Sequence, residues 1–152
     1  MRLFPSKVIH FFSPEENERI VAAIRETERR TSGEIRVYVE SRCRFVNPVD
    51  RAIELFYGLQ MDKTEQRNGV IIYVAIKDHQ LAVYGDEGIH LRVGEAFWKS
   101  EVQQMLRSFS ASNQTEGLIQ MVKHVGEALC HHFPYSPGGD RNELPDEIVF
   151  GK

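Results

Sequence analysis

The sequence predicts an α/β fold, a three-layer α/β/α sandwich in which a small mixed β-sheet lies between layers of helices. Helical and strand-like patterns alternate along the first half of the chain, which favours a parallel strand pair joined by a right-handed crossover. The apolar run 70–76 is typical of a central strand covered on both faces. Only the connector 77–80 separates this run from segment 81–85, so we expect the two to form an antiparallel hairpin.

The first helix has a clear start signal. Ser13 is placed to cap it, Pro14 suits its first position, and Glu16 completes a capping box with Ser13. Apolar residues then recur at helical spacing, as in a helix that packs one stripe on a core. We expect Gly33 to end the helix in a left-handed conformation.

The first strand is predicted over 34–41 because apolar and polar residues alternate there, which gives one buried and one partly polar face. A second helix should start at Asn47 and Pro48, a cap followed by a favourable proline. Apolar residues at helical spacing predict two more helices, over 98–109 and from 115 to about 133.

These elements define one domain over residues 1–133, followed by an extended C-terminal tail over 134–152. The tail is rich in proline and glycine and carries one small apolar cluster at 148–150. Two placements of this cluster stay open: it packs against its own domain, which we favour, or it adds as a strand to the sheet edge of another protein.

Composition limits the function. The formal net charge of −3 gives no basic field for nucleic acid or an anionic membrane. No apolar run approaches the roughly 20 residues of a membrane span, and the N-terminus lacks the pattern of a secretory signal. We therefore expect a cytoplasmic protein, with a monomer favoured. Cys43 and Cys130 share no metal-like spacing and are interpreted as reduced thiols. No nucleophile elbow, Walker loop or zinc-protease motif appears, so whether the protein is an enzyme stays open.

Oxygen-bearing side chains should gather at one rim of the sheet. If strands 34–41 and 69–76 are parallel and 81–85 runs the other way, Glu34, Asn68, Asp86 and Glu87 lie at the same end. Asp62 joins them if its loop folds back.

Carboxylate and amide oxygens suit calcium or magnesium better than zinc, so we predict a divalent-cation site at this rim and no organic cofactor. The alternative, which spacing alone favours, is a carboxylate rim without a metal, whose acidic residues serve a turn and a helix start. His90, beside the rim, is either a ligand or acid–base group or, as we favour, a surface or capping histidine.

Three segments together resemble the TPM domain family, known from thylakoid-lumen photosystem-repair factors and many bacterial proteins. They are TSGEIRVYV (31–39), RNGVIIYVAI (67–76) and GDEGI (85–89). The ending NELPDEIVFGK (142–152) is similar to that of the short, single-domain bacterial branch. The resemblance implies an α/β/α sandwich, divalent-cation binding, mainly of calcium, and acid-phosphatase-like activity as in plant relatives.

Three functions follow as hypotheses. The first is a small binding or regulatory domain whose rim holds a divalent cation or a protein partner. The second is a metal-assisted phosphomonoesterase, for which one or two ions and a positioned water would suffice. The third is a protein-interaction module that uses the C-terminal tail.

Overall fold

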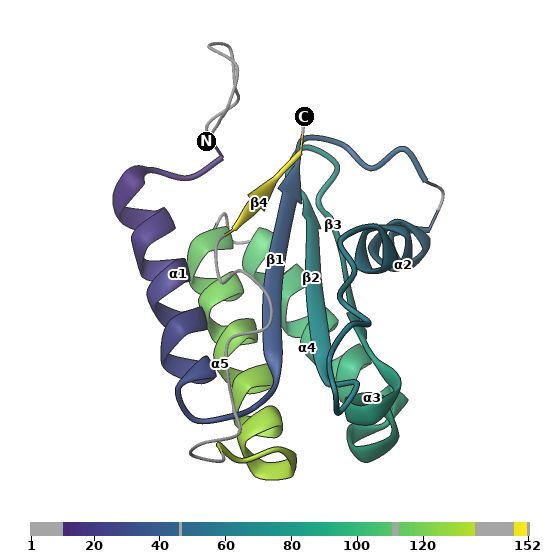
Figure 1. Ribbon diagram of the computed structural model, residues 1–152. Helices are drawn as coiled ribbons and strands as arrows, with labels where there is room; N and C mark the ends of the chain where they lie inside the picture. The colour runs from purple at the N-terminus through teal and green to yellow at the C-terminus, as the bar shows by residue number, and fades with distance from the viewer. Residues whose placement is uncertain (1–10, 46, 111–112, 136–147, 152) are drawn as a thin grey trace.

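The computed structural model describes residues 11–45, 47–110, 113–135 and 148–151. Its centre is a four-stranded sheet in the order β3-β2-β1-β4 (Figure 1). β1 pairs in parallel with β2 and with β4, and β3 is antiparallel to β2. The strands are β1 (Glu34–Glu40), β2 (Gly69–Ala75), β3 (Gln80–Gly85) and β4 (Val149–Phe150). The parallel crossover and the antiparallel hairpin are both confirmed.

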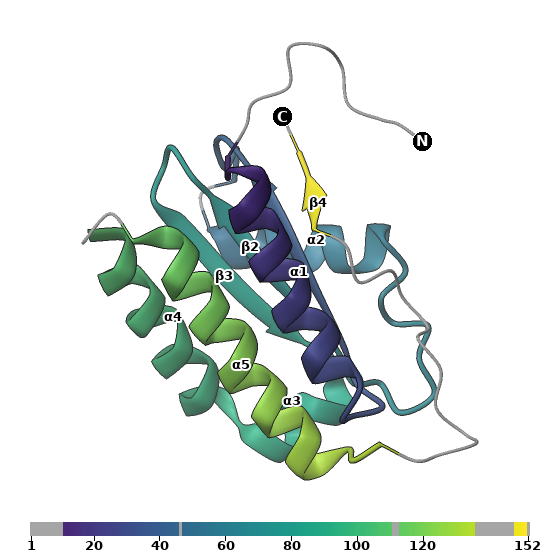
Figure 2. The ribbon, with the colours of Figure 1, turned by 90° about the vertical axis from the view of Figure 1, so that its left-hand side faces the viewer.

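Helices cover both faces of the sheet. α1, α4 and α5 lie side by side on one face, and α2 covers the other (Figures 1 and 2). The short helix α3 follows β3 directly at the end of the sheet. The helices are α1 (Pro14–Glu28), α2 (Pro48–Gly58), α3 (Glu87–Val93), α4 (Glu95–Ser110) and α5 (Gln114–His132). This is the predicted three-layer sandwich.

Two apolar clusters fill the spaces between these layers, one on each face of the sheet. Every residue of β2 is buried, as expected for a strand covered on both faces. β1 differs: its apolar residues face α1 and α5, while its alternate positions carry Glu34, Arg36 and Glu40. All three are buried, with 1–7% of their surface exposed. The face of β1 predicted to be partly polar therefore holds buried charge.

The end of α1 and the segment after β3 correct two expectations, whereas the favoured placement of the tail cluster holds. α1 ends at Glu28, and Gly33 does not have a positive φ. Gly33 instead allows close packing, because a Cβ there would come within 2.6 Å of Leu129 Cδ2. The segment after β3, expected as a turn that leads into a helix, forms the separate short helix α3. The apolar cluster of the tail packs on its own domain, where Val149 and Phe150 form β4; residues 136–147 lie outside the described part of the chain.

The capping box of α1 is confirmed and joins two helices. The Glu16 carboxylate accepts from the backbone N–H of Ser13 at 2.8 Å and from the Thr115 hydroxyl of α5, also at 2.8 Å. These hydrogen bonds, chiefly the one from the Ser13 backbone, lower the pKa of Glu16 below its ordinary value of 4.5.

We expect the charge of Glu16 to stabilise the fold only above acidic pH. Because the folded-state pKa is lowered, this contribution is present above pH 4.5 and is lost as the pH falls through the lowered pKa. Glu16→Gln should therefore lower the free energy of unfolding at pH 7 by up to about 1 kcal/mol, since the side chain is only half-buried. Urea unfolding of both proteins from pH 7 to pH 3 should show this difference shrinking below pH 4.5; a constant difference would contradict it.

Candidate functional site

The rim predicted from the sequence is the end of the sheet where β1 and β2 begin and β3 ends. Glu34 is the register partner of Gly69, and Val70 is the partner of Gly85. The backbone N–H of Asp86 donates to the carbonyl of Gly69 at 2.9 Å. The chain directions on which the rim prediction depends are therefore confirmed, and we call this end of the sheet the amino-end rim.

Asp86 is firmly held at the amino-end rim. It is 1% exposed, and Arg67 donates to both of its carboxylate oxygens, from Nε at 2.7 Å and from Nη2 at 2.8 Å. The hydrogen bond to Asp86 raises the pKa of Arg67. Asp86 Oδ1 also accepts from the backbone N–H of Glu87 at 2.8 Å and so caps α3. This carboxylate already has an ion-pair partner and a capping role.

Backbone geometry is tight where α3 begins. A Cβ on Gly88 would lie 2.1 Å from the backbone oxygen of Gln66, closer than any side chain tolerates. Because the two backbones approach so closely, the N–H of Gly88 donates to the carbonyl of Arg67 at 2.8 Å. The second glycine of the GDEG segment therefore serves packing of α3 against the loop before β2.

Asn68 lies on the opposite face of the sheet from Glu34. Side chains alternate along a strand, so Asn68 shares the α1 and α5 side with Val70, whereas Glu34 shares the α2 side with Arg36. The Asn68 Nδ2 donates to Ser32 Oγ at 3.2 Å and to Gln66 Oε1 at 3.4 Å. The buried Asn68 Oδ1 has no hydrogen-bond partner among the described residues.

The other predicted rim residues are less enclosed. The Glu87 side chain is 67% exposed, with its carboxylate 3.8 Å from Arg67 Nη1. Asp62 is half-buried in the loop after α2. In the described part of the chain, no three His, Cys, Asp or Glu side chains are grouped so as to hold a metal ion. The structure thus brings Glu34, Asn68 and Asp86 to one rim but turns Asn68 to the other face and pairs Asp86 with Arg67.

His90 serves the packing of α3 on α4. The indole N–H of Trp98 donates to His90 Nδ1 at 3.0 Å. An indole nitrogen can only donate, so Nδ1 carries no proton in this arrangement. The histidine therefore accepts a structural hydrogen bond from α4 through Nδ1.

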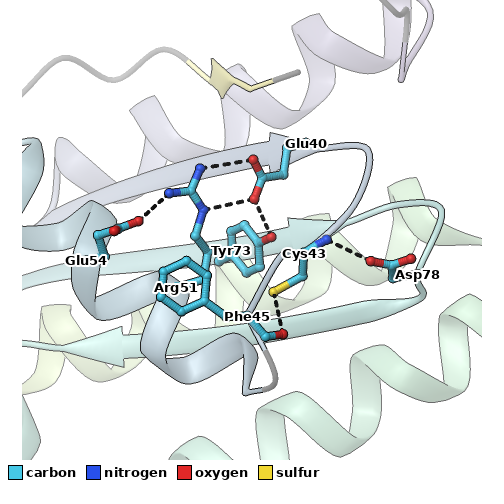
Figure 3. Close-up of polar contacts among 7 residues, drawn as sticks. All are labelled: Glu40, Cys43, Phe45, Arg51, Glu54, Tyr73 and Asp78. Atoms are coloured by element: carbon cyan, nitrogen blue, oxygen red, sulfur yellow. Dashed lines mark hydrogen bonds and ion pairs between the residues drawn. The ribbon is translucent and has the colours of Figure 1, made fainter.

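A second polar cluster, which the sequence did not reveal, lies at the opposite end of the sheet (Figure 3). Glu40, the last residue of β1, is 7% exposed. Its carboxylate accepts from Arg51 of α2 twice, from Nε at 2.9 Å and from Nη2 at 3.0 Å, and from the Tyr73 hydroxyl of β2 at 2.5 Å. Arg51 Nη1 donates in turn to Glu54 at 2.5 Å. Three elements are joined by one buried carboxylate.

Tyr73 stays protonated in this cluster. Burial is the largest cause that raises its pKa, and hydrogen bonds with Glu40 and Cys43 raise it further. The Cys43 backbone N–H donates to Asp78 at 2.7 Å, and its thiol lies 3.5 Å from the carbonyl of Phe45. The one sequence signal for the cluster is Glu40 itself, a charged residue at the end of a strand whose second face is predicted to be partly polar.

The protein-family model of the TPM domain matches residues 8–128 of this chain. The chain belongs to the TPM domain family. The comparison with curated proteins finds no match. Among the described helices of this TPM domain, none is long and apolar enough to cross a membrane.

Solved structures agree with this assignment. The NMR structure of BA42 protein from the psychrophilic bacterium Bizionia argentinensis is similar, with 39% identity and a TM-score of 0.85, covering 97% of this chain and 100% of that chain. The N-terminal domain of cg2496 protein from Corynebacterium glutamicum has 14% identity, a TM-score of 0.59 and 95% coverage of both chains. An N-terminal domain from P. gingivalis has 17% identity, a TM-score of 0.64 and 82% coverage of both chains. The last two comparisons bear on the fold alone.

Proposed function

We propose that this TPM domain is a binding module that takes a divalent cation, calcium or magnesium, at the amino-end rim. The proposal rests on the oxygen of the Asn68 side chain, which is buried and has no hydrogen-bond partner among the described residues. A buried polar atom without a partner is costly, which favours a ligand that supplies one. The resemblance to cation-binding TPM relatives points in the same direction.

The side chains that would hold the cation are those around Asn68. Ser32 Oγ and Gln66 Oε1 are 2.7 Å apart, and both accept from the Asn68 amide. Hydroxyl and amide oxygens are ligands that calcium and magnesium accept. Glu34, at the start of the adjacent strand, contributes only its backbone N–H, which donates to the Asn68 carbonyl at 3.3 Å, because its side chain lies on the other face of the sheet. Asp86 is not needed as a ligand, because Arg67 occupies both of its oxygens.

A ligand set with so few carboxylates should bind calcium or magnesium weakly. Affinity for calcium rises with the number of charged ligands, and we expect a Kd on the order of 10⁻³ M. When bound, the ion would order the loop before β2 and act as a local positive charge.

The test is a calcium titration followed by NMR amide shifts of the full chain. We expect saturable shifts centred on Ser32, Gln66 and Asn68. Asn68→Asp should tighten binding about tenfold, because it adds a carboxylate where the oxygen now lacks a partner. Thermal unfolding without calcium separates this effect from any change in stability.

Glu87→Gln is the matched control, because it removes an exposed rim charge next to Asp86. It should leave the calcium affinity unchanged. The proposal is overturned if the parent shows no shifts at 32, 66 and 68 at about tenfold the expected Kd, or if Asn68→Asp binds no more tightly than the parent.

A further inference from the structure

A cavity lies at the carboxyl ends of β1 and β2, beside the Glu40–Arg51–Tyr73 cluster and at the far end of the sheet from the amino-end rim. Its volume is about 920 Å³, and the loop 41–45 after β1 forms much of its wall. In open α/β sheets, ligands bind outside the carboxyl ends of the parallel strands, where successive loops diverge. We call it the carboxyl-end cavity.

Ser41 places a buried hydroxyl without a partner beside this cavity. The residue is 8% exposed and lines the cavity, and its hydroxyl has no hydrogen-bond partner among the described residues. The backbone N–H of Lys77 donates to the Ser41 carbonyl at 2.8 Å, which fixes these two residues side by side. A buried hydroxyl without a partner favours a ligand atom that accepts a hydrogen bond from it.

The charges around the cavity leave a surplus of cations. Four basic and three acidic side chains line it. Arg51 is held by Glu40 and Glu54, and Arg42 pairs with Asp78 at 2.9 Å. Arg44 and Lys77 form no ion pair with the described residues, and both are exposed at the cavity.

The floor of the cavity is already ordered. Arg51 is fixed by three hydrogen bonds to Glu40 and Glu54, and Tyr73 closes the network from β2 (Figure 3). A ligand that enters therefore meets positioned groups, which lowers the entropy cost of binding.

We propose that the carboxyl-end cavity binds a small oxyanion, a carboxylate or phosphate group, between Arg44 and Lys77, with the Ser41 hydroxyl donating to it. Two cations without a counter-charge match a group of one to two negative charges. The hydroxyl supplies a directional hydrogen bond that a simple halide would use less well. This site is independent of the cation proposed at the other end of the sheet.

Parallel NMR titrations with inorganic phosphate and with succinate test the proposal, against sodium chloride at equal ionic strength. We expect saturable shifts confined to residues 40–45 and 77–78 with at least one of the two oxyanions, and none with chloride. The comparison of phosphate with succinate identifies which group is preferred.

Cysteine alkylation by neutral iodoacetamide gives a second measurement. Cys43 lines the cavity, whereas Cys130 does not, and burial raises the pKa of the Cys130 thiol. The bound oxyanion should slow alkylation of Cys43 about threefold or more and leave Cys130 unaffected, as read by mass spectrometry.

Three variants separate binding from folding. Ser41→Ala should weaken oxyanion binding about threefold to tenfold without lowering the unfolding temperature, because the hydroxyl has no partner to lose. The double variant Arg44→Gln with Lys77→Gln should abolish the shifts. Lys99→Gln with Lys123→Gln removes the same charge from exposed positions outside the cavity and should bind like the parent. The proposal is overturned if chloride gives the same shifts, or if both double variants bind alike.

Discussion

Replacing Glu40 with alanine is expected to lower the free energy of unfolding by about 3–5 kcal/mol. The carboxylate is 7% exposed and accepts three hydrogen bonds, two from Arg51 and one from Tyr73. Its removal leaves the largely buried Arg51 guanidinium without its main counter-charge and the Tyr73 hydroxyl without an acceptor. A buried charge that loses its partner costs more than the pair contributed. Urea unfolding of parent and variant at pH 7 measures the difference.

Two companion variants show which part of the cluster matters. Tyr73→Phe removes one neutral donor and should cost about 1–2 kcal/mol. Glu54→Gln removes the charge of a carboxylate that is 55% exposed and should cost below about 1 kcal/mol. If Glu40→Ala changes stability no more than Glu54→Gln, the carboxylate does not join the three elements as we infer.

Replacing Asp86 with alanine should lower the free energy of unfolding by about 3 kcal/mol, the second largest effect. The substitution breaks a two-point ion pair with Arg67 and removes the cap of α3. The Arg67 side chain is 36% exposed and regains water, which keeps the cost below that of a fully enclosed pair. Chemical unfolding at pH 7 gives the value.

A double-mutant cycle isolates the ion pair from the cap. Asp86→Asn keeps an oxygen that can accept from the backbone N–H of Glu87, so it should cost less than alanine. In the Arg67→Gln background, Asp86→Asn should lower the free energy of unfolding by markedly less than it does in the parent protein, because the Asp86 carboxylate then has no ion-pair partner to lose. Equal costs in both backgrounds would show that Asp86 stabilises the fold only as a cap.

Strand directions were predictable because they follow from local patterns. The wholly apolar β2 could only be a central strand, and the short connector to β3 required a hairpin. The order of helices and strands then fixed the parallel crossover, since the left-handed alternative is rare. These patterns predict that Glu34 and Asp86 lie at one end of the sheet.

Side-chain partners were not predictable in the same way. Asn68 was expected beside Glu34, yet alternation along β2 turns it to the other face. Nothing in the sequence links Arg67 to Asp86, because the pairing depends on how the loop before β2 meets the start of α3. The Glu40 cluster was missed for a related reason: Tyr73 sits within an apolar run, and only the packing of α2 brings Arg51 to it.

The strand β4 has a consequence for how the chain behaves when shortened. It lies beyond the residues that match the family model, yet Gly151 donates to the Val39 carbonyl at 2.6 Å and Phe150 is the register partner of Val39. Loss of these last residues would leave backbone N–H and C=O groups unpaired along the outer edge of β1. Unpaired edge strands form hydrogen bonds with strands of other chains, including other copies of the same protein. We therefore expect a chain that is truncated before β4 to self-associate rather than to unfold.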